Sequence, residues 1–119
     1  MPFKTMLNGL VKKVSGAQGA ILVDWEGESV EQAGSMDEYE LKVLGAHNGV
    51  VLRKVRYILK KMSGDKLQEL VIATEQAQLI VLPVTDDYSL VLCVDRSECL
   101  GRALYESRLC SSRLHREII

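Results

Sequence analysis

The chain has 119 residues, 47% hydrophobic and 26% charged, with a net charge of −1. This length and composition predict one soluble globular domain with a real core. The near-neutral charge argues against a general nucleic-acid binder, and no apolar run reaches the roughly 18–20 residues of a membrane span. The amphipathic start lacks the apolar centre of a secretory signal, and three cysteines without a CxxC pair favour reduced thiols, so we expect a cytoplasmic protein.

The first segment predicts an amphipathic helix over about residues 3–15. Its apolar residues recur at the spacing of one helix face, whereas its lysines fall on the other face. Ser15 and Gly16 should end this helix. Its apolar face would cover one face of a sheet. The residues of that face are Phe3, Met6, Leu7, Leu10, Val11 and Val14.

Two short strands should follow, at residues 20–23 and 28–33. The turn between them contains Gly27, which is free to adopt a positive φ angle. The second strand is much more polar than the first, which suits a sheet edge, where charge discourages pairing with other chains. Trp25, beside the turn, either caps this edge of the sheet or anchors a partner protein.

A long helix is predicted over about residues 36–62. Ser35 and Glu38 have the spacing of a capping box, and the acidic first turns and basic second half match the helix dipole. One side of this helix should pack on the sheet. That side carries Leu41, Leu44, Asn48, Leu52, Val55, Leu59 and Met62, flanked by Val51 and Ile58.

The opposite side of this helix is also apolar. A helix that is apolar on two opposite sides is buried on two sides, and in a chain this short the second partner would be another copy. Gly45 and Gly49 make the middle of the helix thin, which permits either close packing on the chain's own sheet or close approach of a partner. The opposite side, called here the outer stripe, consists of Val43, Ala46, Val50 and Tyr57.

Three consecutive antiparallel strands are expected at the apolar runs 70–73, 79–84 and 90–94, because the breaks between them are too short for a crossover helix. Apolar side chains on both faces of these strands predict a sheet covered on both sides. A third helix over about residues 98–118, with Ser97 as N-cap, would join the first helix as a cover. Its inward stripe is Leu100, Ala103, Leu104, Ser107, Cys110 and Leu114.

Motifs for catalysis are missing from the sequence. We find no phosphate-binding loop, dinucleotide-binding loop or zinc-protease motif. His47 and His115 are each alone, and Asp86 and Asp87 fall in a hairpin turn, where aspartate is favoured for backbone reasons. We therefore predict no catalytic residue, cofactor or metal site, and a binding protein rather than an enzyme.

The order helix, two strands, long helix, three strands, helix resembles the Roadblock/dynein light chain domain family. The resemblance rests on residues 19–27 (GAILVDWEG), the capped long helix, residues 79–97 (LIVLPVTDDYSLVLCVDRS) and residues 100–103 (LGRA). It covers residues 1–119 as one domain. The polar second strand, residues 28–33, departs from the more apolar pattern of the family.

The resemblance implies an α+β fold with three layers, α/β/α, of the roadblock/profilin-like type. The five-stranded antiparallel sheet would have the order 2-1-5-4-3, with the long helix on one face and the terminal helices on the other. It also implies a homodimer in which the third strands pair and the long helices lie side by side. The expected dimer contacts are Val43, Ala46, Val50, Tyr57, Leu70 and Ile72.

The resemblance further implies a non-catalytic homodimer that binds a Ras-like small GTPase and changes its activity or localisation. Two alternatives remain: a light-chain-like subunit that dimerises a larger complex, and a small-ligand sensor of profilin-like shape, which would need a polar-lined cavity between sheet and helix. Four basic residues within one sector of about 60° on the long helix either contact the GTPase or are solvated charges. These residues are Lys42, Arg53, Arg56 and Lys60.

Overall fold

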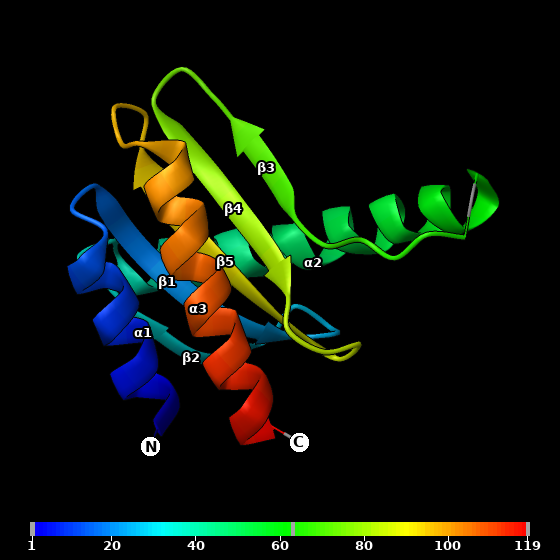
Figure 1. Cartoon of the computed structure of the whole chain (residues 1–119), viewed down its shortest axis with the longest axis horizontal. Coiled ribbons are helices and arrows are strands. Elements are labelled where there is room, and N and C mark those ends of the chain that lie inside the picture. Colours follow the sequence, from blue (N-terminus) through cyan, green and yellow to red (C-terminus); the bar gives the residue numbers. More distant parts are fainter. Residues whose placement is uncertain (1, 63, 119) are drawn as a thin grey trace.

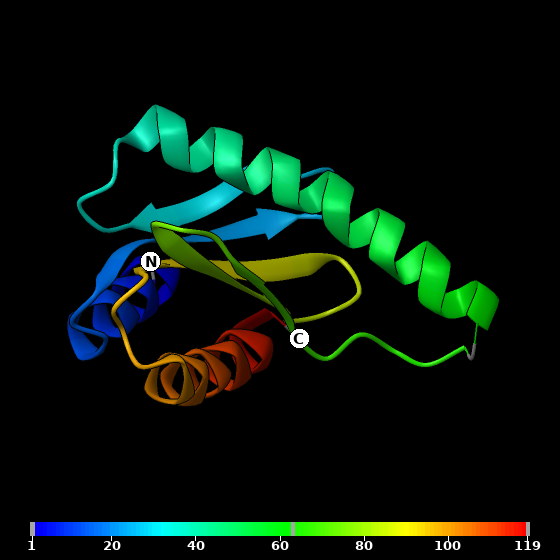
Figure 2. The same ribbon diagram turned by 90° about the horizontal axis from the view of Figure 1, so that it is seen from above.

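A five-stranded antiparallel sheet in the order β2-β1-β5-β4-β3 forms the middle of three layers in the computed structural model, which describes residues 2–62 and 64–118. Helices α1 and α3 cover one face and α2 covers the other (Figures 1 and 2). The predicted fold class and strand order are confirmed. The elements are α1 (Pro2–Lys13), β1 (Ala17–Asp24), β2 (Ser29–Ala33), α2 (Glu38–Met62), β3 (Leu70–Ala73), β4 (Ala77–Pro83), β5 (Tyr88–Asp95) and α3 (Leu100–Ile118).

The larger core lies between the sheet and the two terminal helices. Leu7 and Leu10 of α1 and Cys110 and Leu114 of α3 are buried there against apolar side chains from β1, β4 and β5. The two helices also pack on each other. The predicted joint cover by the first and last helices is confirmed, because their apolar stripes meet the same face of the sheet.

The first half of α2 packs closely on β1 and β2 because two glycines remove the side chains that would hold it away. A Cβ atom at Gly45 would lie 2.7 Å from Cγ1 of Val23, and one at Gly49 would lie 3.0 Å from Cα of Gly27. Gly27 itself has a φ angle of 85°, in agreement with the positive φ angle expected for this turn. The glycines therefore serve packing within the chain, which decides between the two interpretations of them.

The start of α2 differs from the prediction. Asp37 caps the helix: its Oδ2 accepts a hydrogen bond from the Glu40 amide at 3.1 Å, and its carbonyl accepts from the Leu41 amide at 2.9 Å. The capping box at Ser35 is wrong, because the amide of Met36 still donates to a β1 carbonyl and holds this segment against the sheet.

The start of α3 also lies later than expected. The Ser97 hydroxyl donates to the carboxylate of Asp95 instead of capping the helix. The first helical backbone bond runs from the Ala103 amide to the Cys99 carbonyl at 3.1 Å. Ser97 therefore belongs to the turn after β5, and the predicted N-cap is wrong.

The second half of α2 projects beyond the sheet (Figures 1 and 2). This helix has 25 residues, a length of roughly 37 Å, whereas β1 beneath it has 8 residues, roughly 27 Å. Its last buried residue is Leu52. The predicted sheet contact is wrong beyond that point: Met62 is 76% exposed, and Val55 and Leu59 are only half-buried.

Candidate protein-binding surfaces

The two edges of the sheet differ in their protection. At the β2 edge, Lys4 of α1 donates to the carbonyl of Gln32 and pairs with Glu31 at 3.8 Å, so a charged side chain covers this strand. The β3 edge pairs with β4 on one side and has no strand on its other side within the described ranges. The predicted dimer residues Leu70 and Ile72 lie together on β3, half-buried, on the face that α2 covers elsewhere. An open, partly apolar edge of this kind can pair with another chain.

An ion pair fixes the start of this edge strand. Arg108 of α3 binds the Glu69 carboxylate with both Nε and Nη2, the latter at 2.8 Å from Oε1. The hydrogen bond from Arg108 lowers the pKa of Glu69 and the same contact raises the pKa of Arg108. Because Arg108 is exposed, water screens this ion pair, and it acts mainly to position β3 against α3.

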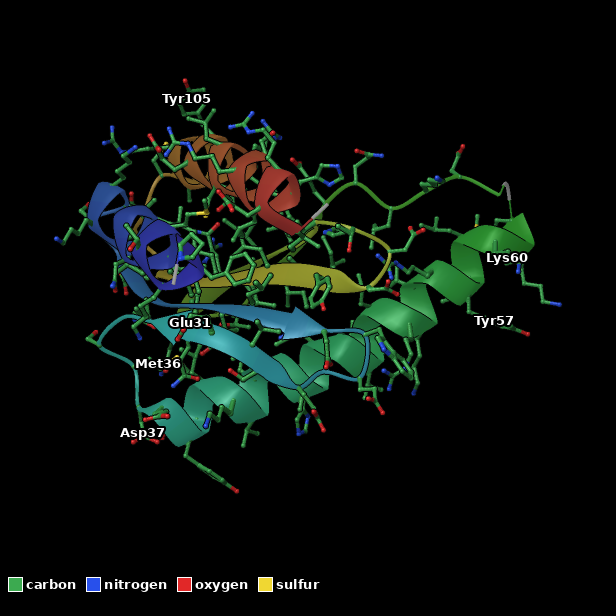
Figure 3. All side chains as sticks on the ribbon, turned by 90° about the horizontal axis from the view of Figure 1, so that it is seen from below. Glu31, Met36, Asp37, Tyr57, Lys60 and Tyr105 are labelled. Atoms are coloured by element: carbon green, nitrogen blue, oxygen red, sulfur yellow. The ribbon has the colours of Figure 1, made fainter. Side chains whose placement is uncertain are left out.

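The outer stripe of α2 faces away from the sheet. Val43, Val50 and Tyr57 are 37%, 43% and 63% exposed, and Ala46 is exposed as well. At about 100° per residue they lie on the side of α2 opposite the buried residues. Figure 3 shows Tyr57 pointing outward from the projecting end. The four residues of the outer stripe therefore lie in one row on α2, but this row faces away from the sheet that contains Leu70 and Ile72.

A second exposed apolar set on α2 was not predicted. Val51, Ile58 and Met62 are 37%, 53% and 76% exposed, although the sequence pattern assigned them to the sheet side. We call Val51, Val55, Ile58 and Met62 the projecting set, since they lie within about 60° of one another on the projecting half of α2. The helix length, which exceeds that of the strands, was the only sequence signal that could have indicated it.

The four predicted basic residues do not form one cluster. Lys42 pairs with Glu38 at 3.5 Å near the start of α2, about 16 Å along the helix from Arg53. Arg53 donates to the carbonyl of Trp25 at 2.9 Å and Arg56 to that of Asp86 at 3.4 Å, so both arginines tie α2 to turns at one end of the sheet.

Lys60 is exposed on the projecting end of α2 (Figure 3). Together with Arg53 and Arg56 it forms a flank, called here the basic flank, on the side of the helix opposite the projecting set. Trp25, whose carbonyl accepts the hydrogen bond from Arg53, is 61% exposed. The turns that accept hydrogen bonds from Arg53 and Arg56 lie on one side of α2, and β3 lies on the other (Figure 1).

The cavity and the groove of this structure limit the size of a ligand that could bind there. A cavity of about 80 Å³ lies between α2 and the sheet, well below the roughly 300–1,000 Å³ of ordinary ligand pockets. A wide groove of about 770 Å³ separates the projecting end of α2 from the β4–β5 turn. Within residues 2–62 and 64–118, no group of His, Cys, Asp or Glu is placed to hold a metal ion, and none of the helices has the length and apolar character needed to cross a bilayer.

Comparisons with known proteins agree with this architecture. A Roadblock/LC7 domain structure from Streptomyces avermitilis superposes with a TM-score of 0.90 at 16% identity, over 97% of this chain and 96% of that one. MglB of Myxococcus xanthus gives 0.91 at 17% identity, over 99% and 95%. The gliding protein mglB of Thermus thermophilus gives 0.87 at 21% identity, over 96% and 86%.

These likenesses, all under 25% identity, establish the fold. No curated protein sequence matches the chain significantly. The model of the Roadblock/LC7 domain matches residues 4–94, which is most of the sequence. The chain therefore belongs to the Roadblock/LC7 domain family.

Proposed function

We propose that this protein is a homodimeric, non-catalytic regulator that binds a Ras-like small GTPase. Family membership and the MglB-type neighbours support a GTPase-regulator role in family terms. The proposal rests mainly on two surfaces on one side of the molecule that pack against no other part of the described chain. They are the open β3 edge and the exposed apolar side chains of the projecting half of α2. The small volume of the cavity between α2 and the sheet argues against the sensor alternative, which requires a ligand site at that place.

The proposed dimer joins two β3 strands, with Leu70 and Ile72 at the junction as predicted. Edge pairing brings the partner in from the side of β3, so each projecting α2 would extend over the other subunit's sheet. There it would cover the half-buried Leu79 of β4, which the chain's own α2 leaves open. The projecting set faces this side and the outer stripe faces away from it, so we propose the projecting set as the helix contribution. The sequence predicted the outer stripe as the helix contact instead, and mutation can distinguish the two.

The proposed GTPase contact is the basic flank. A two-fold dimer would contain two such flanks. An acidic patch on the GTPase would contact Arg53, Arg56 and Lys60 of one flank. Long-range attraction of this kind mainly raises the association rate and weakens with salt. Lys42, which lies apart and is already paired with Glu38, should contribute least.

The test begins with co-purification from the native cell, followed by identification of the bound protein by mass spectrometry. With the recovered GTPase, Arg53→Glu combined with Arg56→Glu should weaken binding at least about tenfold at low salt. Reversal of two exposed charges on the terminal helices, Lys12→Glu with Arg116→Glu, is the matched control and should leave binding unchanged. Unfolding curves must confirm that both variants remain folded.

Two results would refute this assignment. If no GTPase is recovered, and a large non-GTPase protein is dimerised instead, the chain is a structural light-chain-like subunit. If a GTPase binds with equal affinity to the wild type and the Arg53→Glu, Arg56→Glu variant, the basic flank is only a solvated surface and the GTPase docks elsewhere.

A further inference from the structure

The backbone of β2 presents one residue to the open side of the sheet in a regular part of its ladder. This regular part spans residues 31–33, and a bulge interrupts the pairing with β1 before it. Successive residues of an edge strand direct their backbone groups alternately to the neighbouring strand and to the open side. Gln32 is the residue whose N–H and C=O point to the open side, because both of them bond to side chains.

Two charged side chains occupy both of these backbone groups. The Gln32 amide donates to Oε1 of Glu31 at 3.1 Å, and Nζ of Lys4 donates to the Gln32 carbonyl. The same Nζ atom lies 3.8 Å from Oε1 of Glu31, so the two side chains and the Gln32 backbone form a closed set of contacts. Lys4 belongs to α1, which packs against β2, and Figure 3 shows Glu31 beside that helix. Helix α1 therefore holds the ammonium group over the strand edge.

A strand that pairs with β2 needs the groups that these side chains occupy. Antiparallel strands exchange two N–H···O bonds at each hydrogen-bonded pair of residues, and in the regular part of β2 only Gln32 can take part in such a pair. An incoming strand must therefore displace both Lys4 and Glu31. In a two-fold contact each copy would have to displace its own two charges. By contrast, β3 consists of four apolar residues and has no strand on its open side within the described ranges.

We propose that Lys4 and Glu31, called here the edge lock, prevent β2 from pairing with β2 of a second copy and so end assembly at the dimer. A subunit with two self-pairing edges takes a neighbour on each side, and the sheet then grows without limit. A subunit with one closed edge stops at two copies. This inference rests on the proposed β3 dimer for the size of the assembly, whereas the closure of β2 does not depend on that dimer.

The test removes the edge lock in two backgrounds and measures mass by sedimentation equilibrium. Lys4→Ala with Glu31→Ala is made in the wild type and in Ile58→Asp, a change on the exposed projecting set that should remove the β3 dimer. Without the lock, association through β2 should be at least about tenfold tighter. The wild type should then form assemblies larger than a dimer, and Ile58→Asp should form a dimer. Lys12→Ala with Glu28→Ala, which removes the same charges from exposed positions on α1 and just before β2, should change neither mass.

Hydrogen exchange at the Gln32 amide locates the new contact, and urea unfolding confirms that each variant is folded. At low concentration the variant without the lock should lose the protection of this amide, because Glu31 no longer accepts its hydrogen bond. Association through β2 should restore the protection as the concentration rises. Unchanged mass in both backgrounds, or growth that leaves the Gln32 amide unprotected, would overturn the edge lock. A monomeric wild type would refute the β3 dimer instead, and removal of the lock should then produce a dimer in both backgrounds.

Discussion

Replacement of Ile58 by aspartate should dissociate the proposed dimer without unfolding the chain. Ile58 is 53% exposed on the projecting half of α2 and contributes little to the core of its own subunit. Full burial of an isoleucine side chain is worth about 1.5–3 kcal/mol, so burial of its exposed half in a dimer is worth roughly 1 kcal/mol. A two-fold interface contains the residue twice, which doubles this loss.

The charge adds to the loss. An aspartate carboxylate buried in an apolar contact without a partner costs several kcal/mol more, unless the interface opens to admit water. We therefore expect a total loss of at least about 4 kcal/mol, which corresponds to a dimer dissociation constant about 1,000-fold higher. The unfolding free energy of the monomer should change by less than about 1 kcal/mol, because the position is exposed.

Sedimentation equilibrium from nanomolar to high micromolar concentration measures the dimer constant, and urea unfolding measures the monomer. The matched variant is Val50→Asp with Tyr57→Asp, on the outer stripe of the same helix, where the side chains are 43% and 63% exposed. This variant should remain dimeric. If it dissociates while Ile58→Asp stays dimeric, the outer stripe faces the partner, as the sequence predicted, and our edge-pairing geometry is wrong.

Three further predictions concern the monomer. Gly45→Ala should lower the free energy of unfolding in urea by about 1–2 kcal/mol, because the new Cβ atom would lie 2.7 Å from a buried valine of β1. Gly9→Ala is the control: nothing lies within 4 Å of the new Cβ atom, so this change should raise the free energy of unfolding by up to about 1 kcal/mol. Equal effects of the two substitutions would refute the packing role of Gly45. At pH near 8, Ellman's reagent should modify the exposed Cys99 quickly, and Cys110, whose pKa burial raises to about 11, only after unfolding. Arg108 lowers the pKa of Glu69, so the ion pair stabilises the start of β3 at pH values above 4.5, the ordinary pKa of glutamate. This stabilisation is lost as the pH falls through the lowered pKa of Glu69. The protection factors of the β3 amides, which are exchange rates corrected for the intrinsic effect of pH, should therefore fall in acid in the wild type but change little with pH in Glu69→Gln.

The layers of the fold could be predicted because they follow from short-range patterns. Apolar runs with short breaks dictate hairpins, and helical spacing of apolar residues dictates covers. The strand order came from the family resemblance, because periodicity does not order strands. The helix starts were wrong where a tertiary contact decided between neighbouring caps: Met36 bonds to β1, so Asp37 and not Ser35 begins the helix.

The candidate site was only partly predictable. Helical spacing assigns a direction to Ile58 and Met62, but it does not say where the sheet beneath them ends, so exposed residues were assigned to the core. The contacts of Arg53 and Arg56 with two distant turns could not be inferred, because they depend on how α2 crosses the sheet. The polar second strand indicated a sheet edge, but the contact of Lys4 with the Gln32 carbonyl is a property of the packed structure alone.

In the proposed dimer, the first half of α2 stabilises the fold and the second half contacts the partner. In the first half, Gly45 and Gly49 bring the backbone so close to the sheet that any added side chain must displace a neighbour. The last buried residue is Leu52, and beyond it Arg53 and Arg56 still bond to turns of the sheet, whereas Ile58 and Met62 are exposed. We therefore expect substitutions before Leu52 on the sheet side to act on folding, and those at Ile58 and Met62 to act on the proposed assembly. The exposed apolar side chains of the projecting half can therefore change without loss of the core, because the buried contacts of α2 end at Leu52.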